Sequence, residues 1–148
     1  MPDELSDVLS ATAAIETTAM ASLGLKRVYN TPPEALEIFP CSVRYARSGS
    51  LTASKGFGRH NLHHFVIEVH LERARPGGLQ ITDALARPFV EKFHELYATN
   101  LSLNGTCEFC TFEDVSYEAG GLSWGGVDTY GIRFYLWAKV QGAITVEL

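Results

Sequence analysis

The chain has 148 residues, of which 46% are hydrophobic and 11% aromatic, and this is enough for one ordinary domain with a hydrophobic core. Its net charge of -5 at pH 7 argues against a protein that grips nucleic acid over its whole surface, because such binding needs clustered cations. No run of about 18 apolar residues occurs, and the opening ten residues carry acids where a signal peptide carries bases. We therefore expect a soluble protein that is not secreted by that route.

The first predicted element is an amphipathic helix over residues 4–23, where apolar side chains recur every three or four positions with alanines between them. Gly24 is a suitable stop for this helix. Pro32 and Pro33 then exclude a continuous helix, and residues 41–46 predict a short strand.

Residues 47–60 are rich in glycine and serine, which predicts a long, flexible hairpin loop or arm. Its large apolar residues are Leu51 and Phe57. Four cations and no acid fall within sixteen residues here, namely Arg44, Arg47, Lys55 and Arg59. Three interpretations stay open: a solubilising loop, a loop that orders on the acidic surface of a partner subunit, and a direct phosphate contact.

The middle of the chain predicts a strand, a helix and a second strand. Residues 61–74 alternate between an apolar face and a mostly polar face, as a half-buried strand does. Residues 79–98 have helical spacing, but Pro88 lies inside it, so we expect either a kink or a helix proper that starts near Arg87. Residues 106–117 alternate less cleanly and predict an irregular strand.

The clearest strand covers residues 127–140 and follows a glycine-rich hairpin connection around Trp124. One of its faces is wholly apolar. The opposite face carries aromatic rings and cations, namely Arg133, Tyr135, Trp137 and Lys139. This mixture predicts a surface that a helix or a neighbouring subunit partly covers. Residues 143–148 predict a short edge strand.

This order of elements predicts an α+β fold. We expect an antiparallel or mixed β-sheet with two α-helices packed on one face and a long hairpin loop. The sequence contains neither an internal repeat nor a linker, so residues 1–148 form a single predicted domain.

Two sets of residues suggest metal binding. Cys107 and Cys110 form a CxxC motif, but no second pair accompanies it, and a strand would direct the two sulfurs to opposite faces. We interpret the thiols as small hydrophobic groups, and the odd number of cysteines fits a reducing compartment. His64 and His70 share a strand face with Glu68 but lie about 20 Å apart at the usual rise, so we interpret the histidines as solvated or interface residues.

The sequence shows no catalytic signature. It lacks the GxSxG elbow, and Gly56-Phe57-Gly58 lacks the rest of a phosphate-binding fingerprint. Glu113 and Asp114 are adjacent in a predicted strand and face opposite ways, which is unsuited to acid–base catalysis. We expect no enzyme, no metal and no cofactor.

Several segments together resemble a known family. A helix and a PPEAL segment precede FPCSVRYA, a Gly/Ser-rich loop, HHFVIEVHL, a helix with ARPFVEKF, and WGGVDTYGIRFYLWAKV. In length and order of elements, the chain resembles the tail terminator (tail completion) proteins of long-tailed bacteriophages and related phage-like particles. The resemblance covers nearly the whole chain.

The resemblance implies a structural virion protein at the head–tail junction, made in the host cytoplasm. Such subunits form a homohexameric ring on the head-proximal end of the tail tube, stop its polymerisation and dock onto a neck, stopper or connector protein. DNA passes through the lumen without sequence-specific binding, and no membrane is involved. An acidic chain suits this conduit, because like charge keeps the polyanion from adhering.

On this basis, two groups of residues are candidate contacts with a neighbouring subunit or the tube. The first group lies in the predicted loop: Arg47, Leu51, Lys55, Phe57 and Arg59. The second group comprises Arg133, Tyr135, Trp137 and Lys139, which we expect either in the ring interface or packed beneath the two helices.

Other functions remain as alternatives. One is a different neck ring, such as a stopper or head-completion protein, and another is the tail tube protein itself. From a different class, the alternative is a cellular α+β domain that binds a small ligand or metal, or an enzyme that uses the histidine strand and the two nearby cysteines.

Overall fold

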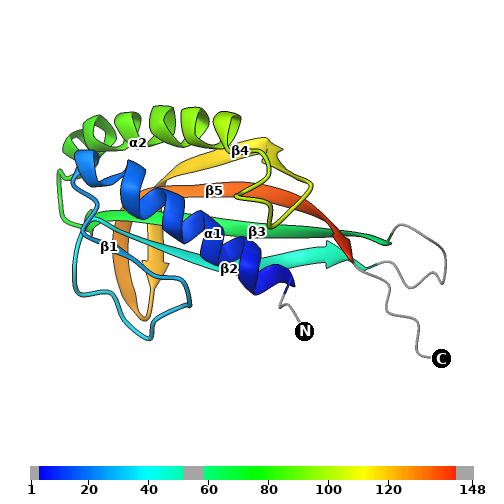
Figure 1. The fold of residues 1–148 in the computed structure, drawn as a ribbon. Coiled ribbons are helices and arrows are strands. Elements are labelled where there is room, and N and C mark those ends of the chain that lie inside the picture. Colours follow the sequence, from blue (N-terminus) through cyan, green and yellow to red (C-terminus); the bar gives the residue numbers. More distant parts are fainter. Residues whose placement is uncertain (1–3, 52–58, 143–148) are drawn as a thin grey trace, which may run out of the picture.

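The computed structural model describes residues 4–51 and 59–142 (Figure 1). Its helices are α1 (Glu4–Ala19), a short 3-10 helix η1 (Ala21–Leu23) and α2 (Leu79–Thr99). Its strands are β1 (Arg27–Val28), β2 (Cys41–Ser50), β3 (Arg59–Arg73), β4 (Phe109–Trp124) and β5 (Val127–Gly142). No helix in this part of the chain is long and apolar enough to cross a membrane.

The five strands form one mixed sheet in the order β1-β2-β3-β5-β4. β1 pairs with β2 in parallel, and the three other pairs are antiparallel. Both α-helices lie on the same side of this sheet (Figure 1). The predicted α+β class, with two helices on one face, is therefore confirmed.

The main core lies between the helices and the sheet. The apolar face of β5 contributes Ile132, Phe134, Leu136, Ala138 and Val140, all buried as their alternation predicts. Phe93 of α2 stacks on Phe134 with the ring centroids 3.9 Å apart. Burying each side chain of this kind stabilises the fold by about 1.5–3 kcal/mol before entropy is counted.

A second, smaller core covers part of the opposite face of the sheet. Leu36, in the segment between β1 and β2, packs on Cys41 and Val43 of β2. Trp124, at the hairpin end of β4, contacts His70 with the ring centroids 6.0 Å apart, and its indole nitrogen donates to the Pro33 carbonyl. Neither α1 nor α2 covers the rest of this face (Figure 1).

α2 is continuous through Pro88, so the prediction of a helix that begins near Arg87 is wrong. The first turn of α2 is held by two hydrogen-bonding contacts of Thr82. The Thr82 hydroxyl lies 2.7 Å from the Gly78 carbonyl oxygen and 2.8 Å from a Glu72 carboxylate oxygen. These contacts anchor the turns before the proline, which removes only one backbone donor.

The predicted loop over residues 47–60 is shorter than expected. β2 extends to Ser50, where Gly49 pairs with His63 and Ser50 with Leu62. Backbone pairing with the strong strand β3 does not depend on the small side chains, and this extends β2 into a sequence that looks like a loop. Residues 52–58 and the predicted strand over 143–148 lie outside the described residues.

β4 is longer and less regular than predicted. It continues through Gly120 and Gly121 to Trp124, so the connection to β5 is only the pair Gly125-Gly126. Phe112 pairs with Leu136 while Tyr117 pairs with Phe134. Four residues, 113–116, therefore stand opposite Tyr135 alone and form a large, irregular bulge.

Candidate functional site

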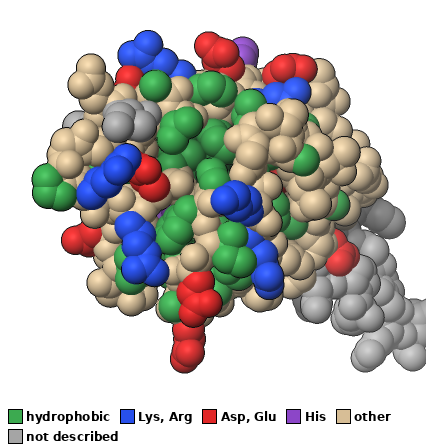
Figure 2. All heavy atoms as spheres, turned by 90° about the vertical axis from the view of Figure 1, so that its left-hand side faces the viewer, with side chains coloured by type: hydrophobic (Ala, Val, Ile, Leu, Met, Phe, Trp, Pro, Cys, Tyr) green, Lys and Arg blue, Asp and Glu red, His purple; other side chains and the backbone are tan. Residues whose placement is uncertain are grey.

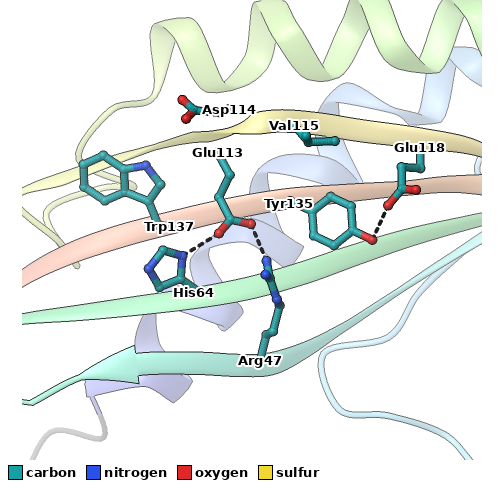
Figure 3. Close-up of a pocket in the computed structure, with 8 residues that line it drawn as sticks. All are labelled: Arg47, His64, Glu113, Asp114, Val115, Glu118, Tyr135 and Trp137. Atoms are coloured by element: carbon teal, nitrogen blue, oxygen red, sulfur yellow. Dashed lines mark hydrogen bonds and ion pairs between the residues drawn. The ribbon is translucent and has the colours of Figure 1, made fainter.

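A hollow of about 730 Å³ opens on the face of the sheet that the helices do not cover (Figure 3). It lies above β3 and β5, and the bulge of β4 forms one wall. Its lining consists of Arg47, His64, Glu113, Asp114, Val115, Glu118, Tyr135 and Trp137. We call this set the acidic hollow.

The bulge brings charge to the hollow. Because residues 113–116 do not follow the regular pairing, the adjacent acids Glu113 and Asp114 both line the same cavity. Val115, the next residue in the chain, is 63% exposed. The Glu113 side chain points toward His64 and Arg47, whereas Asp114 lies on the other side of the β4 ribbon, so the two acids differ in direction although both line the hollow (Figure 3).

Glu113 is held by two partners across the hollow. One carboxylate oxygen lies 2.7 Å from Nδ1 of His64, and the other forms an ion pair with the Arg47 guanidinium (Figure 3). His64 comes from β3 and Arg47 from the irregular position of β2 where the register shifts. This cluster joins three strands on one side of the sheet.

Aromatic rings form the floor of the hollow. The Tyr135 hydroxyl donates to a Glu118 oxygen at 2.6 Å, and the Arg47 guanidinium lies 5.2 Å from the Tyr135 ring centroid. Trp137 packs on Phe109 with the centroids 5.5 Å apart. A cation over a ring of this kind is stabilised by about 0.5–1 kcal/mol at an exposed site.

The lining has an excess of negative charge. The lining contains three carboxylates and one guanidinium, and the ion pairs of the described residues engage Glu113 but neither Asp114 nor Glu118. Both of those acids are exposed. Carboxylates beside aromatic faces suit a cationic group with an apolar neighbour.

A buried polar network lies on the same face, towards β1. The Glu68 carboxylate, only 2% exposed, accepts hydrogen bonds from the Tyr45 hydroxyl and from Arg133 Nε at 3.1 Å. His70 Nε2 lies 2.9 Å from Glu68, and its Nδ1 lies 2.6 Å from the Thr129 hydroxyl. The polar groups of this network satisfy one another's hydrogen bonds, and the network is therefore a rigid support for the open part of the sheet.

Burial and hydrogen bonding shift two pKa values in this network. Burial by itself disfavours ionised Glu68, but hydrogen bonds from His70 and Tyr45 and the charge of Arg133 outweigh it and lower the pKa of Glu68. Burial, together with the hydrogen bond to Glu68, raises the pKa of Tyr45. Glu68 is therefore an ionised acceptor, and Tyr45 stays a protonated donor.

The histidines of β3 are not simply solvated. His70 is fully buried, and His63, 9% exposed, lies 2.6 Å from Glu4 of α1. Exposed His60 lies 3.2 Å from Glu108. The interpretation as solvated or interface residues is wrong for His63 and His70, because both are buried within the subunit, where Glu4 of α1 reaches His63, and Glu68 of the same strand reaches His70.

The two cysteines of the CxxC motif both belong to the main core. Cys107 lies in the turn before β4 and Cys110 in β4 itself, so the expected opposite orientation does not occur. Burial raises the pKa values of the Cys107 and Cys110 thiols. Within residues 4–51 and 59–142, no group of three His, Cys, Asp or Glu side chains could hold a metal ion.

The predicted contact residues separate into three groups. Arg47, Tyr135 and Trp137 meet in the acidic hollow. Arg133 and Lys139 lie on the same face of β5 as Tyr135 and Trp137, so the alternative that this face packs beneath the helices is wrong. Leu51 is 73% exposed, Arg59 begins β3, and Lys55 and Phe57 lie outside the described residues.

Sequence reasoning missed the acids that complete the hollow. The only signal was the irregular alternation around Glu113 and Asp114. Arg44 was also misplaced, since it is fully buried and does not belong to an exposed basic segment. In comparisons with known proteins, no family model and no curated protein sequence matches the chain.

Proposed function

We propose that the protein is a structural virion subunit that forms a ring on the head-proximal end of a phage tail tube. The ring ends tube polymerisation and joins the tail to a neck, stopper or connector protein, and DNA passes through its lumen. The order of elements in the sequence supports this proposal through its resemblance to tail terminator proteins. The protein acts by assembly at the head–tail junction and not by catalysis.

The observation that carries the proposal is the acidic hollow. Arg47 of β2 meets Tyr135 and Trp137 of β5 on a face of the sheet that neither α1 nor α2 covers. Tryptophan, tyrosine and arginine are the residue types that contribute most to binding at protein interfaces. A sheet with one face packed and the other bearing such residues suits a subunit of an assembly.

The polar groups of the hollow support a binding role. Glu113 is engaged by both His64 and Arg47, and the Tyr135 hydroxyl donates to Glu118. These groups satisfy one another and orient the aromatic surface. A general base needs a free proton-accepting position toward a substrate, and this arrangement occupies the carboxylate of Glu113 from two sides.

Light scattering tests the proposal directly. The purified protein is measured alone and then with the candidate tail tube protein, whose elongation is followed by electron microscopy. A ring of about six subunits, or a monomer that becomes a ring on the tube end, is expected to halt elongation. A protein that neither binds the tube nor changes its length contradicts the proposal.

Substitution of Trp137 provides a sharper version of this test. Trp137→Ala is expected to remain folded by circular dichroism but to lose capping, because it removes an aromatic group from the proposed interface. Leu85→Ala is the matched control, since Leu85 is an exposed apolar residue of α2. Equal capping by both variants contradicts an interface role for the hollow. Lys55→Ala/Phe57→Ala tests the predicted contacts in residues 52–58 in the same assay.

A further inference from the structure

We propose that the acidic hollow of one subunit binds the basic end of a second copy of the chain. The basic end consists of Lys26, Arg27 and Arg73 with the apolar turn Ile38–Pro40 between them. The inference deepens the proposed ring function by naming the two surfaces that meet.

The basic end is built from three segments that come together at the β1 side of the sheet. The backbone nitrogen of Lys26 donates to the Pro40 carbonyl at 2.9 Å, and the Arg73 guanidinium lies 6.0 Å from the Phe39 ring centroid. Arg27 lies 5.1 Å from the Tyr29 ring centroid. On this end of the molecule, Lys and Arg side chains lie beside hydrophobic ones, with several Asp and Glu side chains among them (Figure 2).

These three cations are available for a partner. Lys26, Arg27 and Arg73 are exposed, and none of them takes part in an ion pair among the described residues. Ile38, in the middle of them, is 42% exposed although it is a large apolar residue. An apolar tip beside cations is the chemical counterpart of a hollow with aromatic rings and with two carboxylates, Asp114 and Glu118, that form no ion pair among the described residues.

The two surfaces lie far apart on the same subunit. His64 in the hollow and Arg73 at the basic end are nine residues apart on β3, which corresponds to about 30 Å of strand. A contact between two such distant surfaces is heterologous and leaves one of each surface free for a further copy. Repetition of this contact gives a ring when the rotation closes.

Charge reversal distinguishes this contact from others. The hollow variant is Asp114→Lys/Glu118→Lys, and the end variant is Arg27→Glu/Arg73→Glu. The wild type is expected to self-associate at low salt, and each variant alone should associate at least about tenfold more weakly because like charges meet. In an equal mixture, every altered hollow can meet an altered end and every native hollow a native end. The mixture is therefore expected to regain association.

Matched controls carry the same charge changes on α2. They are Glu91→Lys/Glu95→Lys and Arg87→Glu/Lys92→Glu, and both should associate as the wild type does. A wild type that stays monomeric at low salt, or variants that do not rescue each other, would overturn the inference. If the two variants restore each other's association but the protein does not cap tubes, only the proposed function is contradicted. If the protein caps tubes as a ring and these substitutions do not weaken its association, only the inference is contradicted.

Discussion

Arg44 of β2 and Glu16 of α1 form an ion pair with both side chains fully buried. Arg44 Nη2 lies 3.0 Å from one Glu16 oxygen, and Nη1 contacts the other. Thr12 and Tyr97 add hydrogen bonds to the pair, Tyr97 at 3.1 Å from α2. The pair therefore joins both helices to the sheet. Its desolvation is offset only because all partners are present.

Removal of one member of this pair should be strongly destabilising. Glu16→Met leaves a buried guanidinium without its counter-charge, and we expect a loss of about 3–5 kcal/mol in the free energy of unfolding. Arg44→Met should cost a similar amount. The double variant Glu16→Met/Arg44→Met removes both charges and should be more stable than either single variant, although Tyr97 loses its acceptor. Urea denaturation measures all three.

The exposed pair Arg87–Asp83 on α2 is the control for these substitutions. Replacing both residues with alanine should change the free energy of unfolding by no more than about 0.5 kcal/mol beyond helix propensity, because water screens the pair. If the losses from Glu16→Met and Arg44→Met simply add in the double variant, the two side chains are not coupled and the description of this core is wrong.

Glu68 should make the stability depend on pH in the acid range. Its pKa is lowered in the folded protein from the ordinary value of 4.5, so the unfolded chain takes up a proton first as the pH falls. The stabilisation is complete above about pH 5 and is lost as the pH drops through the lowered pKa. Glu68→Gln should flatten this decline, as urea denaturation at pH 5.5, 4.5 and 3.5 would measure.

The same variant should also be less stable at pH 7, by about 1–3 kcal/mol, because it weakens the hydrogen bonds from Tyr45 and Arg133. Glu91→Gln, at an exposed position of α2, is the control and should follow the wild-type pH profile. An unchanged acid slope in Glu68→Gln would show that other carboxylates cause the decline.

Local periodicity was sufficient to predict most of the fold. The strict alternation in β5 placed Phe134 and Leu136 in the core because an apolar strand face must be buried. It could not show that Arg133 and Trp137 face away from the helices. The orientation of these side chains depends on which other segments pack on each face of the sheet. On the face opposite the helices, the segment that carries Leu36 covers only the end of the sheet near β1.

The candidate site was harder to predict because it depends on pairing between distant segments. The bulge at Glu113 arises from the register of β4 against β5, which the sequence of β4 alone does not specify. Arg44 looked like part of a basic loop, since its partner Glu16 lies 28 residues earlier. Tyr135 and Trp137 still met in the hollow, because they alternate with the core residues of β5, and Arg47 joined them through the pairing of β2 with β3.

The three cysteines should react slowly in the folded protein. Cys41, Cys107 and Cys110 are all buried as free thiols, and burial raises the pKa of Cys41 to about 11. The thiolate is the reactive form, so a disulfide reagent at pH 8 should modify few thiols in buffer and three per chain in urea. Rapid modification of two thiols in buffer would contradict their place in the core.

Two glycines in the β4–β5 turn provide a matched comparison of strain and space. Gly125 and Gly126 both have positive φ angles, +57° and +79°, so alanine at either position costs about 1–2 kcal/mol in backbone strain. A side chain at Gly125 would also approach the Glu34 carbonyl oxygen to 2.5 Å, whereas Gly126 faces open space. Gly125→Ala should therefore be less stable than Gly126→Ala by at least about 1 kcal/mol. Equal losses in thermal or urea unfolding would mean that the segment before β2 does not pack against this turn.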